Sequence, residues 1–145
     1  EVSEVLEAML EAVGLNIDLQ VLDVTTFREQ IYRPNKNEEI YMDALGNSFF
    51  DPWIAVRSFE EGRRFRTGWE GPRADQAEAL IQAGAVNMDP VERGAQMSAV
   101  FDIVLQEAIM IPLYQMKDAM GRTDALNWAM PLDGFLWFGD AVLNR

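Results

Sequence analysis

The chain contains neither His nor Cys, so any chemistry must come from carboxylates, hydroxyls, amides, amines, guanidinium groups and aromatic rings. The commonest general base, thiol nucleophiles, disulfides and Cys-type zinc sites are thereby excluded. Asp43 and Asp51 flank one loop, and two carboxylates can act as general acid and base when burial shifts their pKa values. Asp51 directly precedes Pro52, which suits a helix cap. We therefore expect no catalytic residue, no bound metal and no cofactor.

A cluster of polar and aromatic residues gives the strongest indication of ligand binding. Asn47, Ser48 and Phe49 come just before the Asp–Pro pair, Trp53 follows it, and Trp69 lies in a later loop. Aromatic faces with a few amide or hydroxyl groups suit a sugar, a peptide or a planar organic molecule. We predict that Asn47, Ser48 and Phe49 contact a ligand and that Trp53 and Trp69 offer stacking surfaces. The competing interpretation places Phe49, Phe50 and Trp53 in the core.

The net charge of the chain limits the classes of molecule that it can bind. The chain has 12 basic and 24 acidic residues and a net charge of −12. Such a surface repels nucleic-acid phosphates and anionic lipid headgroups, so neither is expected as a partner. Arg63, Arg64 and Arg66 could pair with an anionic ligand, but in so acidic a chain a surface salt network is favoured. The glycines between Gly62 and Gly71 do not form a phosphate-binding motif.

Hydrophobic spacing indicates the elements that position these residues. Apolar residues at intervals of three and four predict an amphipathic helix over residues 2–13 with one buried stripe. Period-two alternation predicts a strand over residues 15–21, and a second strand is expected over 40–46. Thr26 with Glu29 resembles a capping box and opens a short helix to about residue 32. Asp51 followed by Pro52 is a strong helix start.

The second half of the chain is expected to be mainly helical. Residues 61–72 are predicted to form a long loop, and Asp75 with Glu78 is predicted to cap a helix ending near residue 83. Asp89 and Pro90 repeat the Asp–Pro start and open a longer helix to about residue 108. A strand is predicted over residues 111–116, followed by an aromatic tail. This alternation of helices and strands favours an α/β lobe with partly parallel pairing.

The order of these features resembles the C-terminal portion of family 5 extracellular solute-binding proteins, the peptide/nickel-type subunits of ABC importers. The matching segments are residues 5–19, with a helix, a glycine and a strand; residues 24–27; residues 46–52, a loop that opens with Gly and ends in Asp–Pro; residues 75–83; Glu92-Arg93; and residues 111–114. Each motif alone is weak, but their order and spacing together are fairly specific to that family.

The resemblance implies a two-lobed, periplasmic-binding-protein-like fold of which residues 1–145 are a C-terminal lobe fragment, with the N-terminal lobe and signal sequence absent. It implies a periplasmic or membrane-anchored protein that captures a solute and delivers it to an ABC permease. In peptide-binding members an Asp in the loop before Asp–Pro pairs with the ligand's amino terminus, and Ser48 occupies that place here. A hydroxyl lacks the charge-assisted bond that an ammonium group favours. A sugar, an opine-like compound or another organic solute is therefore favoured as the ligand over a plain oligopeptide.

Two other functions compete with solute capture. The chain could be a small acidic interaction domain that docks a partner through its aromatic tail, residues 135–138. An enzyme that uses the two carboxylates of the loop ranks third. If the fragment stands alone, its missing strands leave apolar surface and a sheet edge uncovered, so we also expect self-association of the isolated chain.

Overall fold

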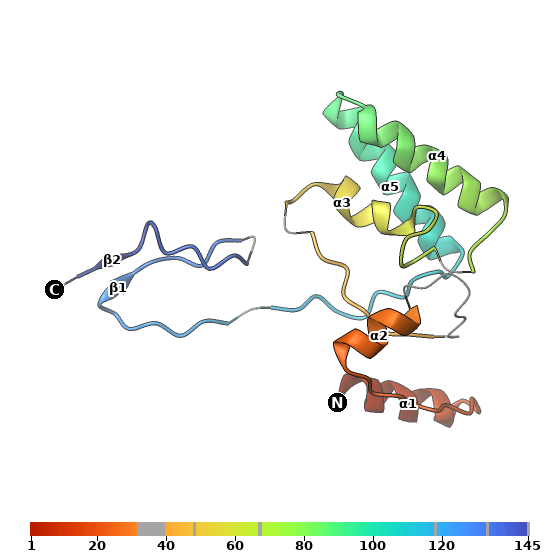
Figure 1. Ribbon diagram of the computed structural model, residues 1–145, viewed down its shortest axis with the longest axis horizontal. Helices are drawn as coiled ribbons and strands as arrows, with labels where there is room; N and C mark the ends of the chain where they lie inside the picture. The colour runs from red at the N-terminus through yellow and green to blue at the C-terminus, as the bar shows by residue number, and fades with distance from the viewer. Residues whose placement is uncertain (32–39, 48, 67, 118, 133, 145) are drawn as a thin grey trace.

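The computed structural model describes residues 1–31, 40–47, 49–66, 68–117, 119–132 and 134–144. Its elements are α1 (Val2–Ala12), α2 (Val24–Ile31), α3 (Pro52–Val56), the 3-10 helix η1 (Arg57–Phe59), α4 (Pro72–Val86), α5 (Pro90–Gln106), β1 (Leu126–Asn127) and β2 (Val142–Leu143). We call residues 52–106 the helical body and residues 111–144 the C-terminal arm. The arm extends away from the body, and α1 and α2 lie below the body in the view of Figure 1.

The core lies in the helical body, where α4 and α5 run side by side as a helical hairpin joined by residues 87–89 (Figure 1). The buried side of α4 carries small or apolar residues at helical spacing, namely Ala74, Ala77, Ile81 and Gly84. The buried side of α5 carries Met97, Val100, Ile103 and Val104. A Cβ atom added at Gly84 would collide with Cε of Met97, so the glycine allows the two helices to approach closely.

Two helix starts are confirmed. Asp51 caps α3 by accepting a hydrogen bond from the Trp53 backbone N–H at 3.0 Å. Asp89 caps α5 by accepting from the backbone N–H groups of Val91 and Glu92 at 2.9 and 3.0 Å. In both helices the next residue is Pro, whose fixed φ and missing N–H suit the first helical position.

Two other helix starts lie earlier than predicted. At α2 the Asp23 carboxylate accepts hydrogen bonds from the backbone N–H groups of Thr25 and Thr26, so Asp23 takes the capping role that was assigned to Thr26. At α4 the helix begins at Pro72, and Asp75 lies within its first turn. Proline at the first position begins this helix without a side-chain cap, and a carboxylate in the first turn still favours the positive end of the helix dipole.

The three predicted strands are absent as strands. Residues 15–21, 40–46 and 111–116 have no strand pairing, and β1 with β2 forms the two-stranded antiparallel ladder of the described chain, Leu126 opposite Leu143. Alternation gives a segment a face to bury but does not supply the neighbouring strand that makes the hydrogen bonds. The α/β lobe therefore stays a prediction.

Helix α1 forms as predicted, but the face that was predicted to be buried is largely exposed. Its bounds agree with the predicted helix, but none of its residues is buried. Val5 and Met9, which were predicted to lie on a buried stripe, are 60% and 62% exposed. An amphipathic helix needs an opposing apolar surface, and the described residues do not bring one to this face.

The C-terminal arm has little core of its own. Trp128 is buried, donates its indole N–H to the Trp137 carbonyl oxygen at 2.8 Å, and packs on the ring of Phe138 at a centroid distance of 4.9 Å. Most large apolar side chains along the arm are exposed. Within the described ranges, no helix combines the length and apolar character needed to cross a bilayer.

Candidate functional site

The Asp–Pro loop is held by an ion pair that connects three helices. Arg93 on α5 donates to both carboxylate oxygens of Asp51 at 2.9 Å, and its Nε donates to the Gly84 carbonyl oxygen at 2.8 Å. The bidentate geometry is the strongest arrangement for a guanidinium and a carboxylate. The third bond satisfies a carbonyl in the last turn of α4, which has no partner within its own helix. We call this arrangement the Asp51–Arg93 clamp.

The clamp also fixes the charge of Asp51. Hydrogen bonding from Arg93 is the main cause that lowers the pKa of Asp51 below its ordinary value of 3.8, and the hydrogen bond from Trp53 N–H adds to it against the opposing effect of burial. A carboxylate held ionised in this way is a poor general acid or base at neutral pH. Asp43 is likewise paired, with Arg64 at 3.1 Å. The cap predicted for Asp51 is confirmed, whereas the ion pair of Asp43 with Arg64 was not predicted.

The loop that ends at this clamp carries two unsatisfied polar atoms. Asn47 Oδ1 and Trp53 Nε1 are inaccessible to solvent and have no hydrogen-bond partner among the described residues. An unpaired buried donor or acceptor destabilises a protein by about 1–3 kcal/mol. One atom is an acceptor and the other a donor, and they lie on opposite sides of the Asp51–Pro52 helix start.

The backbone between these two residues is strained. Phe50 has a φ of 55°, in the left-handed region that residues with a Cβ rarely adopt, and its N–H donates to the Asn47 carbonyl oxygen at 3.3 Å. Phe49 is 74% exposed. The turn therefore presents an aromatic ring to solvent, and strained turns of this kind concentrate at binding sites. Ser48 lies outside the described residues.

Trp53 and Trp69 occupy different environments. Trp53 packs against the core and has the Arg57 guanidinium over its ring, 4.6 Å from the centroid. Trp69 is only 7% exposed and belongs to the core cluster that contains Phe59 and Ile81. This burial does not support the predicted stacking role of Trp69, for which no core position was predicted: the loop folds back and buries its indole ring. A ligand would first have to uncover that ring.

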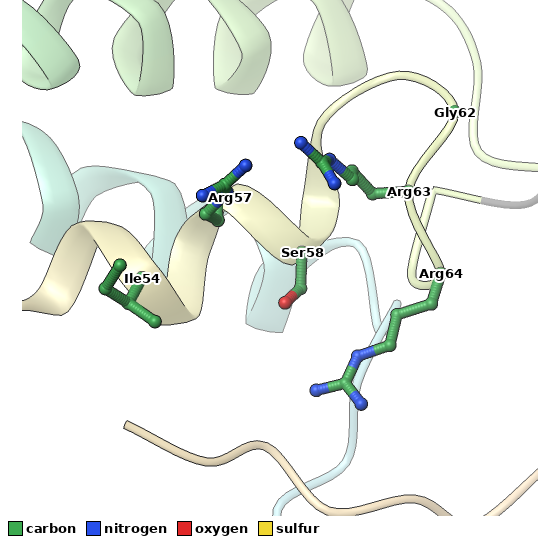
Figure 2. Close-up of a pocket in the computed structure, with 6 residues that line it drawn as sticks. All are labelled: Ile54, Arg57, Ser58, Gly62, Arg63 and Arg64. Carbon is green, nitrogen blue, oxygen red and sulfur yellow. The ribbon is translucent and has the colours of Figure 1, made fainter. Parts of the chain in front are cut away.

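A second feature of the site is an open cavity of about 340 Å³ beside α3 and η1. Its wall is formed by Ile54, Arg57, Ser58, Gly62, Arg63 and Arg64 (Figure 2). The first three follow the spacing of one helical face, and the last three come from the loop that folds back over η1. The Phe65 backbone N–H fixes that fold by donating to the Ser58 carbonyl oxygen at 3.0 Å.

The predicted salt network is confirmed for the loop arginines. Arg63 pairs with Glu60 at 3.4 Å, and Arg64 pairs with Asp43 and also donates to the Ala44 carbonyl oxygen at 3.1 Å. Arg66 donates to the Ala74 carbonyl oxygen at 2.9 Å and approaches two carboxylates of α4, those of Asp75 and Glu78. These contacts attach the loop to residues 43–44 and to the first turns of α4.

Sequence reasoning missed the contact of Arg57 with Trp53 and the pairing of Arg93 with Asp51. Arg57 follows Trp53 by four residues, a spacing that places the two side chains on one helical face, so this contact could have been found. The partner of Arg93 is 42 residues away in the chain, and no local pattern indicates it. Among the described residues, no group of three or more carboxylates is placed to hold a metal ion. No protein-family model, curated protein or solved structure matches the chain.

Proposed function

We propose that this chain captures a small organic solute as part of the substrate-binding component of an ABC transporter. The location would be periplasmic or membrane-anchored, and the partner an ABC permease. The ordered motifs of the sequence support this proposal, and so does the construction of the 47–53 loop. The proposed ligand contacts are Asn47, Ser48, Phe49 and Trp53, with Asp51 and Pro52 as the structural cap.

The observation that carries the proposal is the contrast within this loop. Its helix cap is fixed by the Asp51–Arg93 clamp, whereas Asn47 Oδ1 and Trp53 Nε1 next to the cap lack partners among the described residues. Binding sites gain precision when rigid elements hold them and their recognition groups are left for the ligand. Both atoms are inaccessible to solvent, so a solute with one donor and one acceptor reaches them only when the loop opens, whereas the ring of Phe49 is exposed already.

The proposed ligand class covers sugars, opine-like compounds and peptide-like solutes. An ammonium group would find no carboxylate in the loop, because Asp51 is already paired with Arg93. Plain di- and tripeptides are therefore expected to bind more weakly than solutes recognised through hydroxyl or amide groups.

The test uses the full-length protein encoded by the gene. Thermal unfolding is measured with four sets of compounds: mono- and disaccharides, free amino acids, opines, and di- and tripeptides. The midpoint is expected to rise for members of the sugar or opine sets, because a ligand that binds the folded state stabilises it. Calorimetry with the best compound then compares Asn47→Ala with Asn16→Ala, a substitution at an exposed asparagine outside the loop.

Asn47→Ala should weaken binding about tenfold, as expected for one lost hydrogen bond to a buried group. Asn16→Ala should leave the affinity unchanged. Equal affinities for the two variants would remove Asn47 from the site, and a flat response to all four compound sets would count against solute capture.

A second candidate function is supported by the arm. In the aromatic tail, Phe135, Leu136, Trp137 and Phe138 are each more than half exposed, between 53% and 67%. Contiguous exposed apolar surface of this kind marks interaction sites. We propose self-association or docking through the tail as the alternative, and light scattering tests it. A compact monomer that binds no apolar dye would contradict this alternative and leave solute capture unaffected.

A further inference from the structure

Two guanidinium groups of the cavity lie on the same side of the α3–η1 segment. Figure 2 shows Arg57 and Arg63 in this arrangement, with Arg64 pointing to the opposite side of the segment. Arg64 is engaged there by Asp43 and the Ala44 carbonyl oxygen. Arg57 has no carboxylate partner within the described ranges, and Arg63 uses only its Nε, toward Glu60.

Both side chains are positioned by contacts that leave their donors available. Arg57 is half-buried and lies over the ring of Trp53, 4.6 Å from its centroid. This contact orients the guanidinium plane without using its N–H groups. Arg63 is held by Glu60 within the same turn, and its backbone N–H donates to the Glu60 carbonyl oxygen at 3.0 Å. An arginine has five N–H donors in a rigid fork, so several donors of these two residues have no acceptor among the described residues.

Arg57 has no carboxylate partner among the described residues and Arg63 has one, so the two guanidinium groups that line the cavity keep a net positive charge that attracts an anion. We propose that the cavity binds one oxyanion group, a carboxylate or a phosphate, between Arg57 and Arg63. Guanidinium groups match the geometry of both oxyanions through paired N–H donors. The Ser58 hydroxyl also lines the cavity, but in Figure 2 it points to the side of Arg64, so the two arginines alone supply the proposed donors.

The surrounding charge limits the ligand to a small one. The chain as a whole carries −12, so an extended polyanion such as a nucleic acid is repelled by the rest of the surface. A single oxyanion on a small solute needs only the local pair of arginines. Glu60 pairs with Nε of Arg63 and partly offsets its charge, which further disfavours a ligand of high negative charge. The inference rests on the cavity and does not depend on the transport proposal.

The experiment follows the arginine Nε–Hε signals of the ¹⁵N-labelled protein by NMR during titration with sodium phosphate and, separately, sodium acetate. Ionic strength is held constant with sodium chloride, which also provides the reference titration. We expect saturable shifts of the Arg57 and Arg63 signals with one or both oxyanions. The stronger of the two identifies phosphate or carboxylate as the preferred group.

Arg57→Gln and Arg63→Gln should each weaken binding of the stronger oxyanion at least tenfold. Arg73→Gln is the matched control, because it removes the same charge from a guanidinium that pairs with Glu107 on another part of the surface. Arg57→Lys keeps the charge but loses the fork, and an intermediate affinity is expected. Far-UV circular dichroism establishes that each variant is folded.

Equal weakening by Arg57→Gln and Arg73→Gln would overturn the inference, because only net charge would then matter. Shifts that grow without saturation, or that chloride reproduces, would also overturn it. Phosphate and acetate binding can be measured whether or not any sugar, opine or peptide binds, so this outcome is independent of the outcome for solute capture.

Discussion

The helical body and the C-terminal arm are both rich in large apolar side chains, but the body buries many of them and the arm leaves most of them exposed. The largest fully buried side chains, those of Phe59, Ile81, Met97, Val56, Val100 and Val104, all lie in the body. In the arm the corresponding side chains are mostly exposed, and Trp128 is the buried exception among the described residues. The difference shows that apolar composition does not by itself produce a core. A core forms where two helices pack against each other along their length, as α4 and α5 do. Within the described residues, no element packs against the arm in this way.

Core substitutions should show this contrast with the largest effect. Phe59 is fully buried and contacts the rings of Phe65 and Phe101, whereas Phe135 is 57% exposed. Phe59→Ala should lower the free energy of unfolding by about 3–5 kcal/mol, since it removes a buried ring and leaves a cavity. Phe135→Ala should change it by less than about 0.5 kcal/mol. Urea unfolding followed by far-UV circular dichroism measures both.

A comparable loss for Phe135→Ala would contradict the distinction between body and arm. It would mean that the tail packs against other parts of the protein in solution.

The two Asp–Pro caps provide a smaller and more specific comparison within the body. Asp51→Ala removes a cap and leaves Arg93 without its carboxylate, whereas Asp89→Ala removes a cap alone. A cap contributes about 1 kcal/mol, and the partly exposed ion pair adds about 1 kcal/mol more after screening by solvent. We expect losses of about 2 and about 1 kcal/mol, measured by the same urea titration. Equal losses would show that the clamp adds nothing to the cap.

The smallest expected effect of the clamp is on the pH dependence of the free energy of unfolding. The pKa of Asp51 is lowered in the folded state by Arg93, so the unfolded chain binds its proton more readily. The stabilisation is therefore fully present well above pH 3.8 and is lost as the pH falls through the lower folded-state pKa. Asp51→Asn removes this dependence. The stability difference between the wild type and Asp51→Asn should be constant near neutral pH and shrink in acid.

A difference that stayed constant down to pH 3 would contradict the lowered pKa. Urea titrations at successive pH values measure the difference, and comparison with the variant cancels the titration of the other carboxylates.

Local signals in the sequence predicted the helices of this protein well, for a physical reason. The caps at Asp51 and Asp89 are formed with groups two or three residues away, so the Asp–Pro pairs alone indicate them. The clamp could not be predicted, since Arg93 is 42 residues from its partner. The unpaired state of residues 15–21 could not be predicted either, because alternation describes one strand and never its neighbour.

In the candidate site, too, features set by nearby residues could be predicted and features set by tertiary contacts could not. Asn47 and Trp53 were predicted from their residue types and their place before and after a helix start, and both carry an unsatisfied polar atom among the described residues. Trp69 was predicted as a stacking surface from the same kind of evidence, but its loop folds back and buries the ring in the core. Its burial depends on tertiary contacts with α4 and α5, which the local sequence does not encode.

The most direct test of solute capture uses the tryptophan indole N–H signals of the full-length, ¹⁵N-labelled protein. Trp53 Nε1 has no partner in the described chain, whereas Trp128 Nε1 already donates to the Trp137 carbonyl oxygen. The compound that gives the largest thermal shift is titrated while both signals are followed. Solute capture by the 47–53 loop predicts that the Trp53 signal shifts and its hydrogen exchange slows, while the Trp128 signal stays unchanged. Saturable binding that leaves the Trp53 signal in place would contradict the account.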